Sequence, residues 1–199
     1  MKPIRFYYEF ASPYSYISMM RIEELTAQHG IEVIYQPFLI GPLFKDVGWE
    51  TSPFLIYEAK GKNFFRDIVR EAEHYGLPPL QILDEFPQRG LRAARVALLG
   101  MAEGWGVAFS KAVYRRQFQQ GLPIIGESDV KAVMSETGIE NVNEVYEQAQ
   151  GEENKGRLFE IVNEAKALGL YGAPSFVVGD ELFWGNDRLT RAISYAQRD

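Results

Sequence analysis

Apolar and polar residues follow a strand period at both ends of the chain and a helical period between them. Over residues 4–8 the even positions are apolar and are expected to face inward, with their neighbours outward, which predicts a strand. Helical spacing covers residues 13–29, Gly30 ends it, and residues 31–38 predict a second strand. The first 38 residues therefore predict a β-α-β unit, whose two strands are usually parallel.

The middle of the chain, from about residue 41 to residue 151, has helical spacing and no strand pattern of any strength. The helical stretches are residues 64–75, 91–102, 128–138 with Ser128 as an expected cap, and 141–150. This region is expected to be an all-helical insertion.

The strand period returns near the end of the chain. Residues 153–169 predict an amphipathic helix, and residues 175–185 predict two short strands around a Gly179–Asp180 turn. A last helix is expected from residue 186, capped by Asn186 or Asp187. The two ends together have the thioredoxin pattern. We therefore expect an α/β thioredoxin-like domain from residues 1–38 and 152–199, interrupted by a helical domain from residues 39–151.

Composition argues against several classes of function. A net charge of −6 argues against non-specific nucleic-acid binding, which needs basic patches that neutralise phosphates. The chain has no cysteine, so it cannot exchange disulfides or bind zinc through thiolates. The two histidines, His29 and His74, lie at expected helix ends, so a histidine triad or metal cluster is not expected. With no export signal and no long apolar run, we expect a cytoplasmic protein that does not span a membrane.

The stretch "EFASPYSYIS" places Ser12-Pro13-Tyr14-Ser15 at the turn from the first strand into the first helix. Redox proteins of similar layout carry Cys-x-x-Cys at this turn. A serine before a proline is a preferred helix cap, and this reading accounts for Ser12 without any chemistry. The N–H groups of the helix terminus also favour an anion, so Ser12 could instead donate its hydroxyl to the thiolate of a bound ligand.

Two further segments each allow a structural and a functional interpretation. Pro174 could simply begin the third strand, or the Ala173–Pro174 bond could be cis and offer the Ala173 backbone to a peptide ligand beside Ser12. Asn186 and Asp187 could cap the last helix, or they could bind the two ends of an α-amino acid.

Taken together, these motifs resemble the 2-hydroxychromene-2-carboxylate isomerases, a family related to the kappa-class glutathione transferases in the DsbA-like branch of the thioredoxin fold. The resemblance extends over almost the whole chain, through "FASPYSY", "FLIGPLFKDVGWETSPF", "YEAKGKNFFRD", "FPQRGLRAARVAL" and "APSFVV…ELFWGNDRL". It implies a glutathione-dependent enzyme and a homodimer.

The resemblance also implies roles for individual residues. Ser12 matches the catalytic serine that contacts the glutathione sulfur. The other expected glutathione-binding residues are Lys60, Ala173, Pro174, Trp184, Gly185, Asn186 and Asp187, and the expected substrate-binding residues are Lys45, Trp49 and Glu50. Trp49 and Arg89 stand where the isomerases commonly have asparagine, so the resemblance does not determine which substrate this protein would take.

The activity that the resemblance implies is glutathione-dependent isomerisation of an aromatic conjugated carboxylate, as in aromatic degradation. A glutathione transferase would use the same thiolate but would release a conjugate. A non-catalytic protein that binds peptide or glutathione is a third possibility. A disulfide oxidant of the DsbA type is excluded because the chain has no cysteine.

Overall fold

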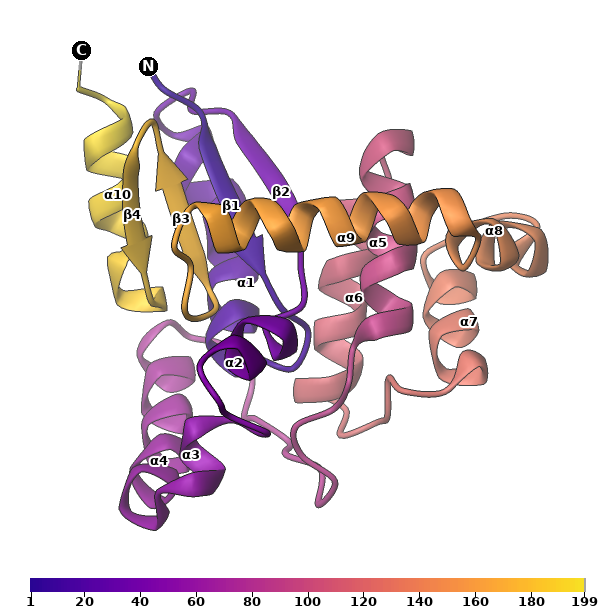
Figure 1. Ribbon diagram of the computed structural model, residues 1–199, viewed down its shortest axis with the longest axis horizontal. Helices are drawn as coiled ribbons and strands as arrows, with labels where there is room; N and C mark the ends of the chain where they lie inside the picture. Colours follow the sequence, from indigo (N-terminus) through magenta and orange to yellow (C-terminus); the bar gives the residue numbers. More distant parts are fainter. Residues whose placement is uncertain (199) are drawn as a thin grey trace.

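A computed structural model describes residues 1–198 and contains one four-stranded sheet with the strand order β2-β1-β3-β4 (Figure 1). The central strand β1 (Ile4–Tyr8) pairs in parallel with β2 (Val33–Pro37) and antiparallel with β3 (Ser175–Val178). β3 turns back into the edge strand β4 (Glu181–Trp184). The predicted parallel pair and the predicted hairpin are therefore both confirmed, and they join in a single mixed sheet.

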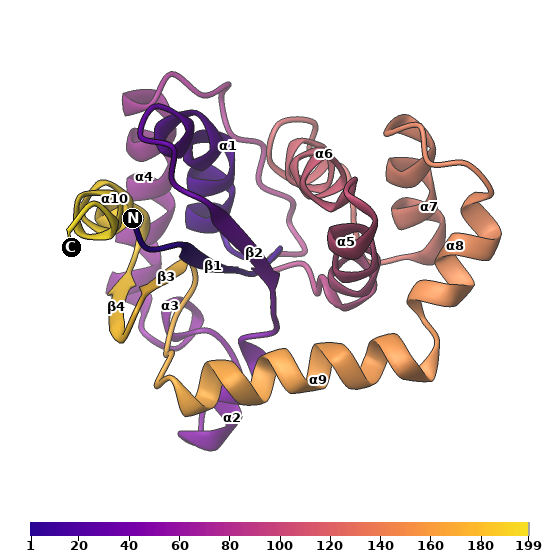
Figure 2. The same ribbon diagram turned by 90° about the horizontal axis from the view of Figure 1, so that it is seen from above.

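Three helices from the two ends of the chain lie beside this sheet: α1 (Pro13–Ala27), α9 (Glu152–Ala167) and α10 (Leu189–Ala196). Figure 2 shows α1 and the long α9 on opposite sides of the sheet. Each side has its own apolar cluster. Phe6 stacks on Phe176 with ring centroids 5.1 Å apart in the larger cluster, which also contains α1 and α10.

One expectation for the first strand is wrong. Tyr7 was expected to face outward, but it is fully buried in the second cluster together with Val162 and Ala165 of α9. Its neighbour Arg5 donates to Glu164, also of α9, at 2.6 Å. Both faces of β1 are covered because α9 runs back across the sheet after the insertion, and the strand period alone gives no sign of that helix.

The segment between β2 and α9 forms the helices α2 (Gly41–Asp46), α3 (Pro53–Ile56), α4 (Glu58–His74), α5 (Leu91–Glu103), α6 (Gly106–Phe118), α7 (Glu127–Glu136) and α8 (Val142–Ala149). Within residues 1–198 no strand lies in this region, so the prediction of a helical insertion is confirmed. The larger apolar cluster runs without a break from Phe6 of the sheet to Val113 of α6. The division into two domains at residues 38 and 152 stays a prediction.

Some helix boundaries differ from the sequence expectation. Helices α2, α3 and α6 were not predicted. Helix α7 begins one residue before the expected cap Ser128, because Gly126 is the N-cap and its N–H donates to the Asp129 carboxylate at 2.8 Å. Across the described residues, no helix combines the length and apolar character needed to cross a membrane.

Candidate active site

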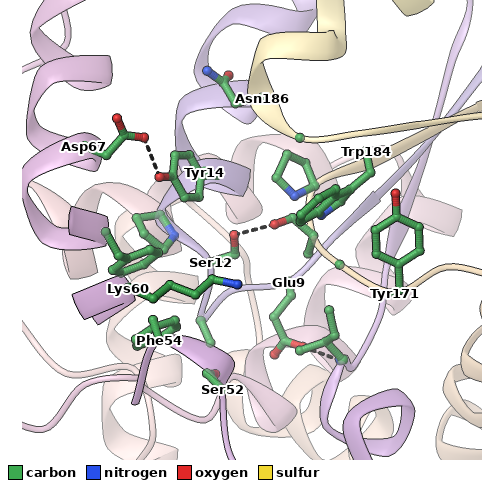
Figure 3. A pocket seen from close by; sticks show the side chains of 18 of the residues that line it. Glu9, Ser12, Tyr14, Ser52, Phe54, Lys60, Asp67, Tyr171, Trp184 and Asn186 are labelled. Carbon is green, nitrogen blue, oxygen red and sulfur yellow. Dashed lines mark hydrogen bonds between the residues drawn. The ribbon is translucent and has the colours of Figure 1, made fainter. Parts of the chain in front are cut away.

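A pocket of about 620 Å³ opens where β1 ends and α1 begins (Figure 3). It is bordered by α1, by the first helices of the insertion, and by the loops that precede β3 and follow β4. Nine of the predicted site residues line it: Ser12, Trp49, Lys60, Ala173, Pro174, Trp184, Gly185, Asn186 and Asp187. The fold therefore brings together segments that are more than 150 positions apart in the sequence.

Ser12 has a structural contact on each side of its hydroxyl group. Its Oγ accepts a hydrogen bond from the Ser15 N–H at 3.1 Å and so caps α1. The same hydroxyl donates to the Ala173 carbonyl oxygen at 2.9 Å (Figure 3). The cap interpretation of Ser12 is correct, and the hydroxyl also faces the pocket. Its proton can turn from Ala173 to a ligand atom without breaking the cap, because the cap uses only an oxygen lone pair.

The loop before β3 contains the cis Ala173–Pro174 peptide bond that was predicted. The Pro174 carbonyl accepts a hydrogen bond from the Gly185 N–H at 3.0 Å, which ties this loop to the end of β4. Trp184 lies over Gly172, where an added Cβ atom would be only 1.9 Å from the indole Nε1. Tyr171 packs against the same indole with ring centroids 4.9 Å apart, so two half-exposed aromatic side chains form one rim of the pocket.

Asn186 does not cap the last helix, contrary to one expectation. Residues 186–188 form a short 3-10 turn, and α10 begins at Leu189 without a side-chain cap. The Asn186 side chain is 3 % exposed, accepts from Ser18 and Arg21, and donates to Glu71 at 2.9 Å. It therefore connects the tail to α1 and α4. In Figure 3 its amide points away from the pocket centre.

Asp187 and Lys60 supply opposite charges to the pocket lining. Asp187 is exposed, with Arg188 3.4 Å away. Lys60 lies in the first turn of α4 and extends toward Ser12 in Figure 3. Among the described residues that line the pocket, Lys60 is the one lysine or arginine. An anionic group entering the pocket would therefore be attracted toward this side chain.

Tyr14 and Asp67 are pocket residues that the sequence analysis missed. The Tyr14 hydroxyl donates to the Asp67 carboxylate at 2.6 Å, which joins α1 to α4 at the pocket wall. This hydrogen bond lowers the pKa of Asp67. Burial, and then the bond to Asp67, raises the pKa of the Tyr14 phenol, so this phenol stays neutral near neutral pH. No local sequence signal could pair residues 53 positions apart.

The part of the pocket near α2 and α3 is aromatic. Phe44 of α2 packs edge-on against Trp49 at 5.6 Å, and Phe54 stacks on Phe64 with centroids 4.2 Å apart. These four side chains belong to the pocket lining. The phenylalanines at 54 and 64 occur in segments quoted for the family resemblance, but their stacking could not be read from spacing.

Glu9 is a further pocket residue that the sequence analysis missed. It follows β1 directly, lies at the pocket wall, and is only 6 % exposed. Burial raises the pKa of its carboxyl group to about 7, although a hydrogen bond from the Ile40 N–H opposes this shift. The sequence signal that could have identified Glu9 is the presence of an acidic residue within the largely apolar run "IRFYYEF".

The remaining predicted residues lie elsewhere. Lys45 and Glu50 are exposed and do not belong to the pocket lining, and neither does Arg89. The substrate-binding role given to Lys45 and Glu50 stays a prediction. No group of three His, Cys, Asp or Glu side chains among residues 1–198 is arranged to hold a metal ion.

Fold and site together define a thioredoxin-type protein in which a serine caps the first helix beside a cis-proline loop. The chain belongs to the DSBA-like thioredoxin domain family, whose sequence model matches residues 3–195.

Relatives at low identity are enzymes. The chain is 28 % identical to the 2-hydroxychromene-2-carboxylate isomerase of Sphingobium xenophagum, over 98 % of this chain and 97 % of the relative. It is 25 % identical to the glutathione S-transferase kappa 1 of Caenorhabditis elegans, over 94 % of this chain and 87 % of the relative.

Solved structures have the same fold. A structure of 2-hydroxychromene-2-carboxylate isomerase matches with a TM-score of 0.85 at 23 % identity, covering 96 % of this chain and 93 % of the other. The cytosolic disulfide reductase DsbM of Pseudomonas aeruginosa, solved with GSH, matches with a TM-score of 0.67 at 15 % identity, covering 97 % and 96 %. At these identities the likeness concerns the fold alone.

Proposed function

We propose that this protein is a glutathione-dependent isomerase of an aromatic conjugated carboxylate, of the 2-hydroxychromene-2-carboxylate isomerase type. The observation that carries the proposal is the position of the Ser12 hydroxyl. It lies at the N-terminus of α1, in contact with the carbonyl of Ala173 in the cis-proline loop, in a chain that has no cysteine. Relatives that are isomerases and kappa-class transferases support the choice of chemistry.

The lining of the pocket fits glutathione by the chemistry of its groups. A tripeptide thiol has an ammonium group, two carboxylates, peptide groups and a sulfur. Asp187 can hold the ammonium group, and Lys60 can hold a carboxylate. The Ala173 backbone can pair with the peptide, and Ser12 can donate to the sulfur. A volume of about 620 Å³ is in the range of small-molecule sites.

When bound, glutathione would supply a thiolate that adds reversibly to an electrophilic carbon. The protein's own groups would make that possible. The positive end of the α1 dipole and the Ser12 hydroxyl would favour the negative charge on sulfur and so lower the pKa of the thiol. Lys60 would orient the anionic ligand through its charge. The aromatic walls, which include Phe44 and Phe54, would hold a planar substrate and exclude water.

The alternative activity is glutathione transfer, in which the same site would release a conjugate. The two outcomes differ in whether glutathione is consumed. We would incubate the protein with glutathione and 2-hydroxychromene-2-carboxylate, follow isomerisation by ultraviolet absorbance, and analyse the products by mass spectrometry. Isomerisation that requires glutathione and leaves its concentration unchanged is expected. Accumulation of a conjugate would instead favour the transferase.

Binding can be tested without knowing the physiological substrate. Glutathione at 100 times its Kd should stabilise the protein by about 2.7 kcal/mol, measured as a rise in unfolding temperature. Lys60→Ala should weaken this shift. Lys62→Ala is the matched control, because Lys62 lies on the same helix, pairs with Glu58 at 2.6 Å and is not part of the pocket lining. No thermal shift with reduced or oxidised glutathione would contradict the proposal and favour a protein that binds another peptide.

A further inference from the structure

Glu9 is a buried carboxyl group to which the mechanism above gives no role. The side chain follows β1 and lies three residues before Ser12, with an exposed fraction of 6 %. Its Oε2 accepts the Ile40 N–H, at the point where the chain enters α2. None of the ion pairs among residues 1–198 includes Glu9. Burying a carboxyl group without a cation is costly, so its presence in a pocket wall points to a function.

The position of Glu9 places it on the aromatic side of the pocket. Ile40, whose N–H it accepts, directly precedes α2, which carries Phe44. In Figure 3 the Glu9 carboxyl group points away from Asn186 and Trp184, into the half of the view that also holds Ser52 and Phe54. Trp184 and Asn186, which are expected to bind glutathione, therefore lie on one side of Ser12, and Glu9 lies on the other.

The titratable groups around Glu9 do not form an ion pair with its carboxyl group. From α6, Tyr114 donates its hydroxyl to the Glu9 backbone carbonyl at 2.8 Å, not to the carboxyl group, and the pKa of this phenol is raised by burial. From α4, Lys60 and Asp67 reach the same pocket, and Asp67 is occupied by Tyr14. From α2, the charged side chains at positions 45 and 46 are exposed and outside the lining.

We propose that Glu9 is a catalytic acid–base residue that exchanges one proton with the conjugated substrate. This inference rests on the proposed function. Addition of a thiolate would form a carbon–sulfur bond, break the carbon–carbon π bond and move an electron pair to the substrate's carbonyl oxygen. The O–H bond of Glu9 breaks, its electron pair stays on the carboxylate, and a new O–H bond forms on the substrate oxygen. After rotation about the single carbon–carbon bond, the carboxylate takes the same proton back as the sulfur leaves. No other reactant is needed.

Glu9→Gln is the sharpest test, because the amide keeps the size of the side chain and can still accept the Ile40 N–H, but it cannot transfer the proton. With 2-hydroxychromene-2-carboxylate and glutathione, kcat should fall by about 100-fold, the lower end of typical acid–base contributions. The thermal shift produced by glutathione should remain. Glu9→Asp, which keeps a carboxyl group, should recover part of kcat. Glu73→Gln is the control, since Glu73 is exposed on α4 outside the lining.

The pH dependence separates catalysis from a structural role. Because Glu9 acts first as an acid, activity of the wild type should decline as pH rises above the pKa of about 7. This decline should disappear in Glu9→Gln. A readout without glutathione is the infrared band of the protonated carboxyl group, which should titrate near the same pH in the free wild-type protein and be absent from Glu9→Gln.

The possible outcomes are distinguishable. If the wild type does not isomerise the substrate with glutathione, the proposed function fails and this inference fails with it, although the infrared titration would still report a protonated Glu9. If the wild type is active and Glu9→Gln keeps both its kcat and its decline at high pH, only the role of Glu9 is refuted. An equal loss of kcat and of the glutathione thermal shift would also overturn it, because the side chain would then serve binding or folding.

Discussion

Replacing Ser12 by alanine tests both of its roles at once. The substitution removes the acceptor for the Ser15 N–H and the donor to the Ala173 carbonyl oxygen, at 3.1 and 2.9 Å respectively. A lost serine cap costs about 0.5 to 2 kcal/mol. A second lost hydrogen bond adds about 1 kcal/mol. We therefore expect the free energy of unfolding to fall by about 2 kcal/mol.

Chemical denaturation of the ligand-free protein measures this loss. The matched control is Ser194→Ala, since the Ser194 hydroxyl is exposed and donates only to the Thr190 carbonyl within its own helix. Its effect should stay within about 0.5 kcal/mol. If Ser12→Ala is no more destabilising than this control, the two contacts of Ser12 do not stabilise the fold and the structural reasoning is wrong.

The catalytic role of Ser12 predicts a second effect, in the presence of glutathione. Loss of the hydroxyl should raise the pKa of the bound thiol, seen as a shift of the thiolate absorbance to higher pH, and should slow turnover by folded protein. Ser12→Cys should form a mixed disulfide with oxidised glutathione, detected by protein mass. Full turnover by Ser12→Ala, together with an unmodified Ser12→Cys, would leave Ser12 as a helix cap only.

Three other perturbations have defined outcomes. Asn186→Ala removes a buried amide with three partners and should destabilise the protein by about 3 kcal/mol in chemical denaturation, whereas Asp187→Ala at the exposed neighbour should change stability little. Gly172→Ala should displace the Trp184 indole, because the new Cβ atom would lie 1.9 Å from its Nε1. We expect a changed tryptophan fluorescence spectrum and a weaker glutathione thermal shift. An unchanged spectrum would contradict the packing of Trp184 on Gly172. Glu9 holds its proton more tightly in the folded than in the unfolded state, so its stabilising contribution is present at low pH and should be lost between pH 4.5 and about 7. The free energy of unfolding should fall over this range by about 3 kcal/mol relative to Glu9→Gln. Equal pH profiles of stability for the two proteins would refute the pKa shift.

Much of the fold could be predicted from the sequence because its signals are local. The strand at residues 4–8, the helix that begins at Pro13 and the Gly179–Asp180 turn each depend on neighbours along the chain, and all three appear in the structure. The motif that contains Ser12 was likewise visible. Its two interpretations could not be separated locally, because the second partner of the hydroxyl, the Ala173 carbonyl, is 161 positions away.

Local sequence signals were sufficient for the secondary-structure order of the two ends, for the helical character of the middle, and for the exclusion of disulfide chemistry, since the chain has no cysteine. They gave the helix cap as one of two possible roles of Ser12. Three features came from long-range packing: α9 covers Tyr7, Asn186 holds the tail to α1 and α4, and Glu9 is buried beside the aromatic wall. The physical reason is the same in each case. Burial and side-chain partners depend on which distant segments cover a residue. Hydrophobic periodicity indicates which residues share a face of a helix or strand, but not which segment packs against that face.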